Sequence, residues 1–369
     1  MVSDASWVGE GQAQFQIGNA FYRTHSIVAR DLAVLVGALH KADTGSLRVL
    51  DAMAGCGVRC LRYYLESGAD ALWANDADPD VAPTLRQNLA RTIASERWRT
   101  SYEQANRVFF ECHNRKDYYD LVDVDNFGSP DRHINTLLWA VRIGGYAYLT
   151  STDGRSATGR IPDKSLSVFG AYARAHPAAH EQGLRLMLGS LQQQSSRQNL
   201  GIVPVFSLFT RETYRTMVRL VTERDLSGRN FAFLGYCHQC GNYRTVGWRE
   251  LGQASCSHDG AALAVSGPMW LGALHERSFV ARMRELAYAW SWRKRARLLA
   301  TMAREATMPP YFHSFQEIGR RGNLSLPKRD ALLRQLQARG YRASETHLNA
   351  QAIKTDADMA TCIAIARQG

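Results

Sequence analysis

The chain has 369 residues, of which 45% are apolar, so it is long enough for two domains with a sizeable core. No stretch approaches the roughly 18 consecutive apolar residues of a membrane span, and residues 1–11 lack the basic start and apolar core of a signal peptide. We therefore expect a cytoplasmic protein that has no membrane association, and the sequence indicates no obligate protein partner. A net charge of +11 favours a polyanionic partner, nucleic acid first, although a generally arginine-rich composition gives the same figure.

The first part of the chain alternates short apolar strands with helical patterns. Strands are predicted at residues 48–52, 71–75, 107–111, 118–125, 145–150, 202–208 and 214–221, with helices at 58–67, 79–93 and 134–142. This alternation predicts an α/β fold with a mostly parallel, doubly wound sheet that binds ligands at the carboxyl ends of its strands.

The pattern changes near residue 222, where we place a domain boundary between residues 1–221 and 222–369. The second part has a glycine-rich segment with cysteines at 236–272, a long basic helix at 277–304 and a short helix at 328–339. These features predict a smaller α+β C-terminal domain.

A loop containing glycines follows the first strand of this sheet, with the sequence D-A-M-A-G-C-G from Asp51 to Gly57. Glycines such as Gly55 and Gly57 let backbone amides approach a ligand, and the following helix supplies partial positive charge. Asp76 ends the next strand, where an acid typically binds ribose hydroxyls. Together these residues predict a nucleoside-type cofactor, although a tight turn needed for packing would explain the loop alone.

The strand predicted at 118–125 runs into the sequence D-N-F-G-S-P, from Asp125 to Pro130. An exocyclic amine on an aromatic ring is a poor nucleophile, so an enzyme that methylates it must orient its N–H groups with acceptors. The Asp125 carboxylate and the backbone carbonyl of Asn126 provide such acceptors, and Phe127 provides a ring that stacks on a base. The alternative is a turn that uses Asp, Asn, Gly and Pro for their local conformations.

Several motifs spread along the chain resemble those of one enzyme family. They are Glu10-Gly11, Phe21-Tyr22, Arg30-Asp31-Leu32, Asp51 to Arg62, Ala74-Asn75-Asp76, Asp123 to Pro130, Thr150 to Asp153, Tyr172-Ala173, Glu181, Tyr214, Gly267 to Gly272, Thr346-His347 and Ile353 to Asp356. The chain thereby resembles the tRNA (guanine-N2-)-dimethyltransferases that act on guanine 26. The resemblance implies a Rossmann-like methyltransferase domain joined to a C-terminal tRNA-binding domain.

The resemblance also implies roles for individual residues. S-adenosylmethionine would contact Arg30, Asp51, Gly55, Gly57 and Asp76. Asp125 would orient the guanine amine, and Phe21 and Phe127 would line a pocket for a base turned out of the helix.

This chain departs from the family pattern at several points. Asn126 stands where the family usually has proline, and no aspartate occurs near Cys112, where an acid that meets the adenine amine is expected. Residues 21–24 read F-Y-R-T instead of F-Y-N-P, and residues 29–32 read A-R-D-L instead of N-R-D-L. These changes leave the fold expectation intact and bear on activity and target position.

Cysteine spacing in the second part suggests a metal site. Cys237 and Cys240 are separated by two residues, and Cys256 lies two residues before His258. These four residues resemble the ligands of a zinc ribbon, with His258 in place of a fourth cysteine and Asp259 at the position where that cysteine would stand. A metal-free loop is the alternative.

The basic helix predicted at 277–304 contains eight basic residues and one acidic residue, interleaved with aromatic residues. We expect its residues Arg293, Lys294, Arg295 and Arg297 to contact the phosphate backbone of tRNA. A solvated face whose aromatic residues belong to the core is the alternative.

The sequence therefore predicts a tRNA methyltransferase that uses S-adenosylmethionine to methylate N2 of a guanine, giving N2-methyl- and N2,N2-dimethylguanosine. A tRNA-binding homologue that has lost catalysis is one alternative, and a methyltransferase acting on rRNA or DNA is another.

Overall fold

The computed structural model describes residues 7–325 and 328–368, and these residues form two compact units. The first unit contains the described residues up to 151 together with 217–222 and 282–296. The second contains 152–216, 223–281 and the described residues from 297 onward. The division of the chain near residue 222 stays a prediction. In the described part of the chain, no helix has both the length and the apolar character that crossing a bilayer requires.

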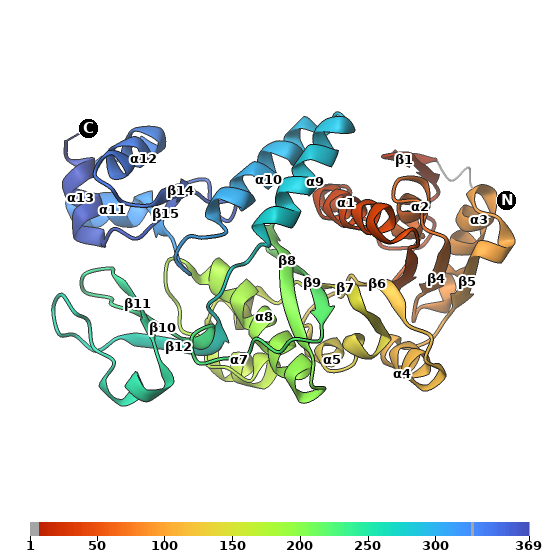
Figure 1. Ribbon diagram of the computed structural model, residues 1–369, viewed down its shortest axis with the longest axis horizontal. Helices are drawn as coiled ribbons and strands as arrows, with labels where there is room; N and C mark the ends of the chain where they lie inside the picture. The colour runs from red at the N-terminus through yellow and green to blue at the C-terminus, as the bar shows by residue number, and fades with distance from the viewer. Residues whose placement is uncertain (1–6, 326–327, 369) are drawn as a thin grey trace. The chain divides into compact units, whose positions relative to one another are not determined.

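A seven-stranded sheet organises the fold, with the strand order β5-β4-β3-β6-β7-β9-β8 (Figure 1). Its strands are β3 (Arg48–Asp51), β4 (Ala71–Asn75), β5 (Trp98–Ser101), β6 (Tyr119–Val124), β7 (Val141–Ser151), β8 (Gly201–Thr210) and β9 (Thr213–Val221). The five strands from β5 to β7 pair in parallel. Arg211 and Glu212, both with positive φ, form the two-residue turn between β8 and β9, so these two strands run antiparallel. The predicted α/β class with a mostly parallel sheet is confirmed.

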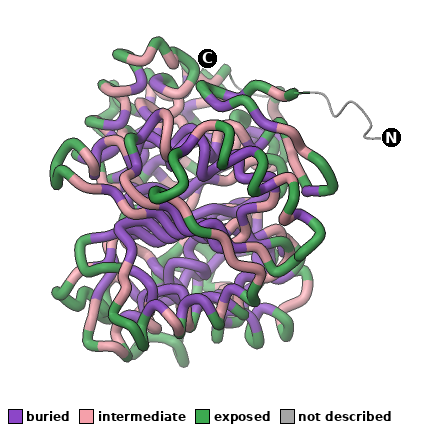
Figure 2. Tube along the Cα trace, turned by 90° about the vertical axis from the view of Figure 1, so that its right-hand side faces the viewer, coloured by how far each residue is buried: buried purple, intermediate pink, exposed green. Residues whose placement is uncertain are grey.

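The burial of the strands explains why the sequence forms this sheet. All six residues of β6 are buried, as are three of the four in β3, and Figure 2 shows the strands as a band of buried chain. Strands covered on both faces read as apolar runs rather than as alternating patterns. The strand order reverses between β3 and β6, and α/β sheets bind ligands at such a switch point.

Helices and a short hairpin complete the part of the chain that carries the parallel strands. The hairpin is β1 (Val8–Glu10) with β2 (Ala13–Phe15), and the helices are η1 (Thr24–Ser26), α1 (Ile27–Thr44), α2 (Val58–Leu65), η2 (Pro79–Val81), α3 (Ala82–Thr92), η3 (Ser95–Arg97), α4 (Ala105–Arg115), α5 (Asp131–Ile134) and η4 (Leu137–Ala140). Helix α1 was not predicted from the sequence, although eleven of its 18 residues are buried.

Two elements predicted in this region are wrong. Residues 107–111 are not a strand but part of α4, because Ala105, Val108, Phe109 and Cys112 are buried at helical spacing. The third strand of the parallel set is β5, whose four residues are at most half-buried and lack an apolar run. The helix predicted at 134–142 is instead α5, η4 and the first residues of β7.

Two small antiparallel sheets belong to the second unit, with the orders β11-β10-β12 and β13-β15-β14. Their strands are β10 (Phe231–Tyr236), β11 (Tyr243–Val246), β12 (Ala264–Trp270), β13 (His313–Ser314), β14 (Ala343–Glu345) and β15 (Ala352–Thr355). The remaining helices are α6 (Gly154–Ala157), α7 (Pro162–Phe169), α8 (Ala179–Arg197), η5 (Trp248–Gln253), α9 (Arg277–Ala289), α10 (Arg293–Glu305), α11 (Phe315–Gly322), α12 (Arg329–Ala338) and α13 (Met359–Ala366). The α+β expectation for the C-terminal region is confirmed.

The single basic helix predicted at 277–304 is wrong, because α9 and α10 are separate helices. Ser291 between them has a φ of +61°, which a right-handed helix does not allow. Arg293 therefore begins a new helix.

A buried ionic cluster in the second unit joins three of the motifs noted in the sequence. The Lys354 ammonium donates to Glu181 at 2.5 Å and to the carbonyl of Pro309 at 2.9 Å. Arg185 also donates to Glu181, and to the carbonyls of Trp270 and Gly272. Because isolated buried charges are costly, the pairing explains how charged residues are accommodated in this core.

Candidate functional site

The candidate site is built where the carboxyl ends of β3, β4 and β6 meet. Asp51 at the end of β3 pairs with Ala74 of β4 on one side and with Asp123 of β6 on the other. Chain segments that leave these strands therefore emerge at the same edge of the sheet.

The loop between β3 and α2 requires glycine at both predicted positions. Gly55 has a φ of +52° and Gly57, which caps α2, has a φ of +82°. A Cβ atom on Gly57 would lie 2.8 Å from the end of the Leu85 side chain, which would have to move to make room for it. Glycine lets the backbone turn sharply here and start α2 with its amides facing the strand ends.

Asp76 organises the same loop from the end of β4. Its carboxylate accepts hydrogen bonds from the backbone amides of Gly55 at 2.8 Å and of Asp78 at 2.9 Å. The side chain is half-buried, so the carboxylate is fixed in direction beside the loop. Oriented in this way, it suits the recognition of hydroxyl groups.

Asp51, the last residue of β3, directly precedes the loop and is completely buried. Burial first, and then the neighbouring Asp123 carboxylate, raises the pKa of Asp51 to about 8. Its carboxyl group accepts from the Met53 amide and the Cys60 thiol, each at 3.4 Å. Asp51 therefore stabilises the loop through its contacts with Met53 and Cys60. Its predicted contact with S-adenosylmethionine stays a prediction.

Arg59, which was not among the predicted site residues, bridges two carboxylates at the end of β6. Its Nη1 donates to Asp123 at 2.9 Å, and its Nη2 forms an ion pair with Asp125 at 2.6 Å. The Tyr63 hydroxyl donates to the same Asp123 oxygen at 2.6 Å. Asp123 is fully buried, whereas 28% of the Asp125 side chain is exposed. Arg59 thus fixes a carboxylate that can still reach a ligand.

The segment from Asp125 to Pro130 forms a tight loop after β6. The Asn126 side chain donates to the Ser129 carbonyl at 2.6 Å, and the Ser151 hydroxyl donates to the Gly128 carbonyl at 3.2 Å. Gly128 has a φ of +85°, which explains the glycine. These hydrogen bonds hold the backbone of the loop at Gly128 and Ser129.

Among the described residues, the most exposed large hydrophobic side chains are Phe21 and Phe127. Phe21 is 72% exposed and Phe127 is 76% exposed. The Arg23 guanidinium lies over the Phe21 ring, 4.7 Å from its centre. Exposed rings of this size are available to stack on a flat ligand.

Arg30 makes its hydrogen bonds within the protein, and these do not test its predicted role in cofactor binding. Arg30 is 4% exposed, and its guanidinium is paired with Glu10 and donates to the Arg23 carbonyl. Its predicted contact with S-adenosylmethionine stays a prediction.

The position near Cys112, where an adenine-contacting acid is expected, lies in a helix and not after a strand of the sheet. Cys112 is buried in α4, whereas the strand beside β4 is β5, which ends at Ser101. Glu103 follows two residues later, and its backbone amide donates to Asn75 at the end of β4. Glu103 is thus an acidic residue that follows β5, and its carboxylate forms an ion pair with Arg107 at 2.7 Å.

The cysteines of the second unit come together, but with Asp259 rather than His258. Sulfur atoms of Cys237, Cys240 and Cys256 and a carboxylate oxygen of Asp259 all lie within 4.8 Å of one another. His258 instead faces Asp358, with Nε2 3.5 Å from its carboxylate. Three thiols and one carboxylate are a donor set that suits zinc. The prediction of His258 as a ligand is corrected.

Two similar turns shape this cysteine cluster. The carbonyl of Cys237 accepts from the amide of Gly241, and that of Cys256 accepts from Gly260. The backbone amides of Cys240 and His258 approach the sulfur atoms of Cys237 and Cys256 at 3.5 Å. The turns direct the sulfur atoms toward one point, as a bound ion requires.

The basic residues predicted on the RNA-binding helix differ in their surroundings. Arg293, Lys294 and Arg297 of α10 are exposed. Arg295 is mostly buried and pairs with Asp31 of α1 at 2.5 Å. The first three remain available for a polyanion, whereas Arg295 already has an anionic partner.

The chain is similar to known proteins along nearly its whole length. The model of the N2,N2-dimethylguanosine tRNA methyltransferase family matches residues 8–367. The chain is 27% identical to the tRNA (guanine(26)-N(2))-dimethyltransferase of Archaeoglobus fulgidus over 98% of both chains, and 26% identical to that of Pyrococcus abyssi over 91% of this chain and 90% of the relative. The fold is similar to that of Trm1 from Pyrococcus horikoshii, solved with S-adenosyl-L-methionine, with a TM-score of 0.85, 24% identity and coverage of 98% and 99% of the two chains.

The cysteine cluster gives a prediction about metal content. We expect the purified protein to contain about one zinc ion per chain, and Asp259→Ala to lower that content because it removes a ligand. His258→Ala should retain the zinc, because its side chain faces Asp358 instead. Elemental analysis by mass spectrometry measures both variants. Equal retention by the two variants, or loss only in His258→Ala, would contradict the assignment of Asp259.

Proposed function

The chain belongs to the N2,N2-dimethylguanosine tRNA methyltransferase family, and we propose that it transfers methyl groups from S-adenosylmethionine to guanine at the ends of β3, β4 and β6. The observation that carries this placement is the Asp125 carboxylate, which Arg59 fixes at the edge of the sheet beside the glycine loop. Guanine 26 is the target we infer, because the relatives from A. fulgidus and P. abyssi are named for that position.

The residues at the strand ends suit the parts of S-adenosylmethionine. The Asp76 carboxylate, oriented by the Gly55 and Asp78 amides, would accept hydrogen bonds from the ribose hydroxyls. The loop from Gly55 to Gly57 would let the backbone approach the cofactor closely. Glu103, which follows β5, would be the acceptor for the adenine amine.

The guanine would be held by the segment from Asp125 to Phe127. Its N2 hydrogens would meet the Asp125 carboxylate and the backbone carbonyl of Asn126, and its ring would lie between the exposed aromatic residues Phe21 and Phe127. Asn126 replaces the family's usual proline, yet its backbone carbonyl remains in place and its side chain stabilises the loop. This departure is therefore compatible with catalysis.

The reaction needs little covalent chemistry from the protein. A C–N bond forms between N2 and the methyl carbon while the C–S bond breaks, and sulfur leaves as a neutral thioether. N2 would then lose a proton, which the Asp125 carboxylate would accept. Orientation and electrostatic complementarity therefore supply most of the catalysis.

The tRNA would be held in part by the exposed basic residues of α10. Arg293, Lys294 and Arg297 carry three positive charges on adjacent turns of one helix. Contacts from such residues to phosphates release counterions and make binding depend on salt. The net charge of +11 supports the same reading.

Cofactor binding should depend on Asp76. Asp76→Ala removes the acceptor for the ribose hydroxyls and releases the Gly55 amide, so S-adenosylhomocysteine should bind about 5- to 150-fold more weakly, the equivalent of roughly 1–3 kcal/mol. Titration calorimetry measures the dissociation constant. An affinity within about twofold of the wild type would show that Asp76 does not contact the cofactor.

Catalysis should depend on Asp125. Asp125→Ala should lower the rate of methyl transfer by roughly two orders of magnitude, because it removes the acceptor that orients N2. Binding of S-adenosylhomocysteine and tRNA should change little, since the carboxylate holds the bulk of neither. Single-turnover transfer of radiolabelled methyl groups to an unmodified tRNA transcript provides the measurement.

Two substitutions of the next residue are matched controls. Asn126→Pro and Asn126→Ala both keep the backbone carbonyl, and both should retain transfer within about tenfold, the loss coming from the missing bond to Ser129. Full activity of Asp125→Ala, or a loss of transfer in Asn126→Ala as large as that in Asp125→Ala, would contradict the assigned roles.

A further inference from the structure

Six charged side chains form a buried network in the first unit, and neither the family match nor the proposed chemistry uses them together. They are Glu10 of β1, Arg30 and Asp31 of α1, Arg62 of α2, Glu66 directly after α2, and Arg295 of α10. Three are carboxylates and three are guanidinium groups, so the charges of the network balance.

Arg62 lies at the centre of this network and is completely buried. Its Nη1 contacts Glu10 at 3.0 Å, and its Nη2 contacts Asp31 at 2.7 Å and Glu66 at 2.8 Å. One guanidinium is thus shared by three carboxylates. The charge balance of the network also requires the other two arginines: Arg30 pairs with Glu10, and Arg295 pairs with Asp31.

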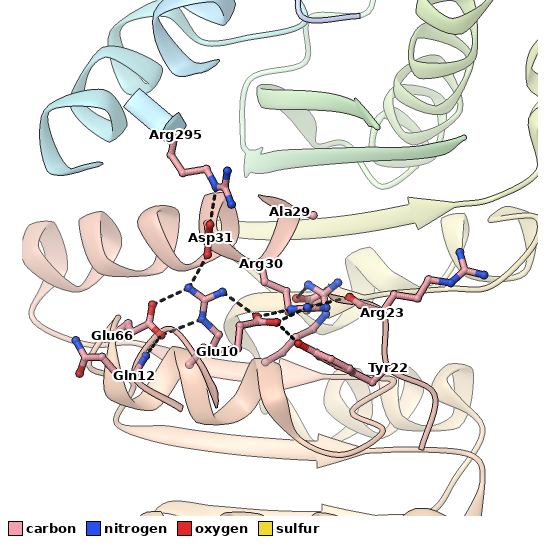
Figure 3. Close-up of polar contacts among 12 residues, drawn as sticks. Glu10, Gln12, Tyr22, Arg23, Ala29, Arg30, Asp31, Glu66 and Arg295 are labelled. Atoms are coloured by element: carbon pink, nitrogen blue, oxygen red, sulfur yellow. Dashed lines mark hydrogen bonds and ion pairs between the residues drawn. The ribbon is translucent and has the colours of Figure 1, made fainter. Parts of the chain in front are cut away.

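Arg295 is the most exposed member of the network, with 18% of its side chain accessible. Figure 3 shows its guanidinium directed toward Asp31. Without Arg295, the second Asp31 oxygen would lose its cationic partner, and two arginines would serve three buried carboxylates. Leaving a buried charge uncompensated is unfavourable, so the remaining groups would rearrange.

The other end of the network holds the backbone beside Phe21. Glu10 accepts a hydrogen bond from the Tyr22 hydroxyl at 2.7 Å, and Arg30 donates to the Arg23 carbonyl at 3.1 Å (Figure 3). Burial first, and then the hydrogen bond to Glu10, raises the pKa of Tyr22 to about 12, so its hydroxyl stays a donor. Phe21 itself is largely exposed, and the Arg23 guanidinium lies over its ring.

We propose that Asp31 and Arg295 are positioning residues, which act through Arg62 and Glu10 to hold Phe21 where the target guanine stacks. This assignment replaces the predicted phosphate contact of Arg295, and it rests on the proposed role of Phe21 in the base pocket. The network fixes residues 21–23 before the base arrives, so its effect falls on the transfer step rather than on the affinity for either substrate.

The test is the kinetics of Asp31→Asn, which keeps the size of the side chain and removes its charge. We expect kcat for methyl transfer to fall at least about tenfold, with dissociation constants for S-adenosylhomocysteine and tRNA within about threefold of the wild type. Arg295→Gln should cause the same fall, and Arg295→Lys should restore most of the activity because it keeps the charge. Arg295→Gln also provides the test if Asp31→Asn does not fold.

A second ion pair on the same helix is the matched control. Asp43 of α1 pairs with Arg282 of α9 at 2.6 Å, but both side chains are more than 40% exposed. Asp43→Asn should therefore leave kcat unchanged within about twofold, because exposed pairs contribute little.

A double variant separates positioning from general destabilisation. If Asp31 acts through Phe21, Asp31→Asn should cause almost no further loss of kcat in a Phe21→Ala background. An unchanged kcat in the single variant Asp31→Asn, or losses that multiply in the double variant, would overturn the positioning role. Full activity of Phe21→Ala alone would instead contradict the base pocket of the proposed function.

Discussion

The ion pairs of Arg59 with Asp123 and Asp125 are the interactions on which the site depends most. Asp123 is fully buried and also bonded to the Tyr63 hydroxyl, so one side of the guanidinium is anchored in the core. The other side meets Asp125, which is partly exposed at the edge of the sheet. The Asp125 carboxylate lies on a loop, but its pairing with Arg59 holds it in one orientation, as if it were a core side chain. Reactions that depend on orientation require this rigidity, since the sulfonium group of the methyl donor is already reactive.

Local patterns along the chain predicted most of the central sheet. Strands buried on both faces give short apolar runs, and glycines with positive φ are conspicuous between a strand and a helix, so β3, its loop and Asp76 were evident. The same reasoning failed at residues 107–111, because the adjacent Val108, Phe109 and Phe110 form a run that suits either a strand or a buried helix face. Because of that error, β5 was not predicted, and Glu103, which follows it, was not among the predicted site residues.

Interactions between distant residues were beyond the reach of sequence patterns. Arg295 and Asp31 lie 264 positions apart, and nothing in the basic composition of α10 distinguishes the buried arginine from its exposed neighbours. Arg59 was likewise one arginine among many until the fold placed it between two carboxylates. At the cysteine cluster, the spacing suggested a metal site but could not decide which of His258 and Asp259 faces the sulfur atoms, because that depends on the turn ending at Gly260.

We propose that this chain methylates N2 of a tRNA guanine with the groups at the ends of β3, β4 and β6. The decisive experiment is nucleoside mass spectrometry after incubating the protein with S-adenosylmethionine and an unmodified tRNA transcript. We expect N2-methylguanosine followed by N2,N2-dimethylguanosine, and neither product from a transcript in which guanine 26 is replaced by adenine. A protein that binds the transcript in a salt-dependent manner and leaves every guanosine unmodified would contradict the proposed function.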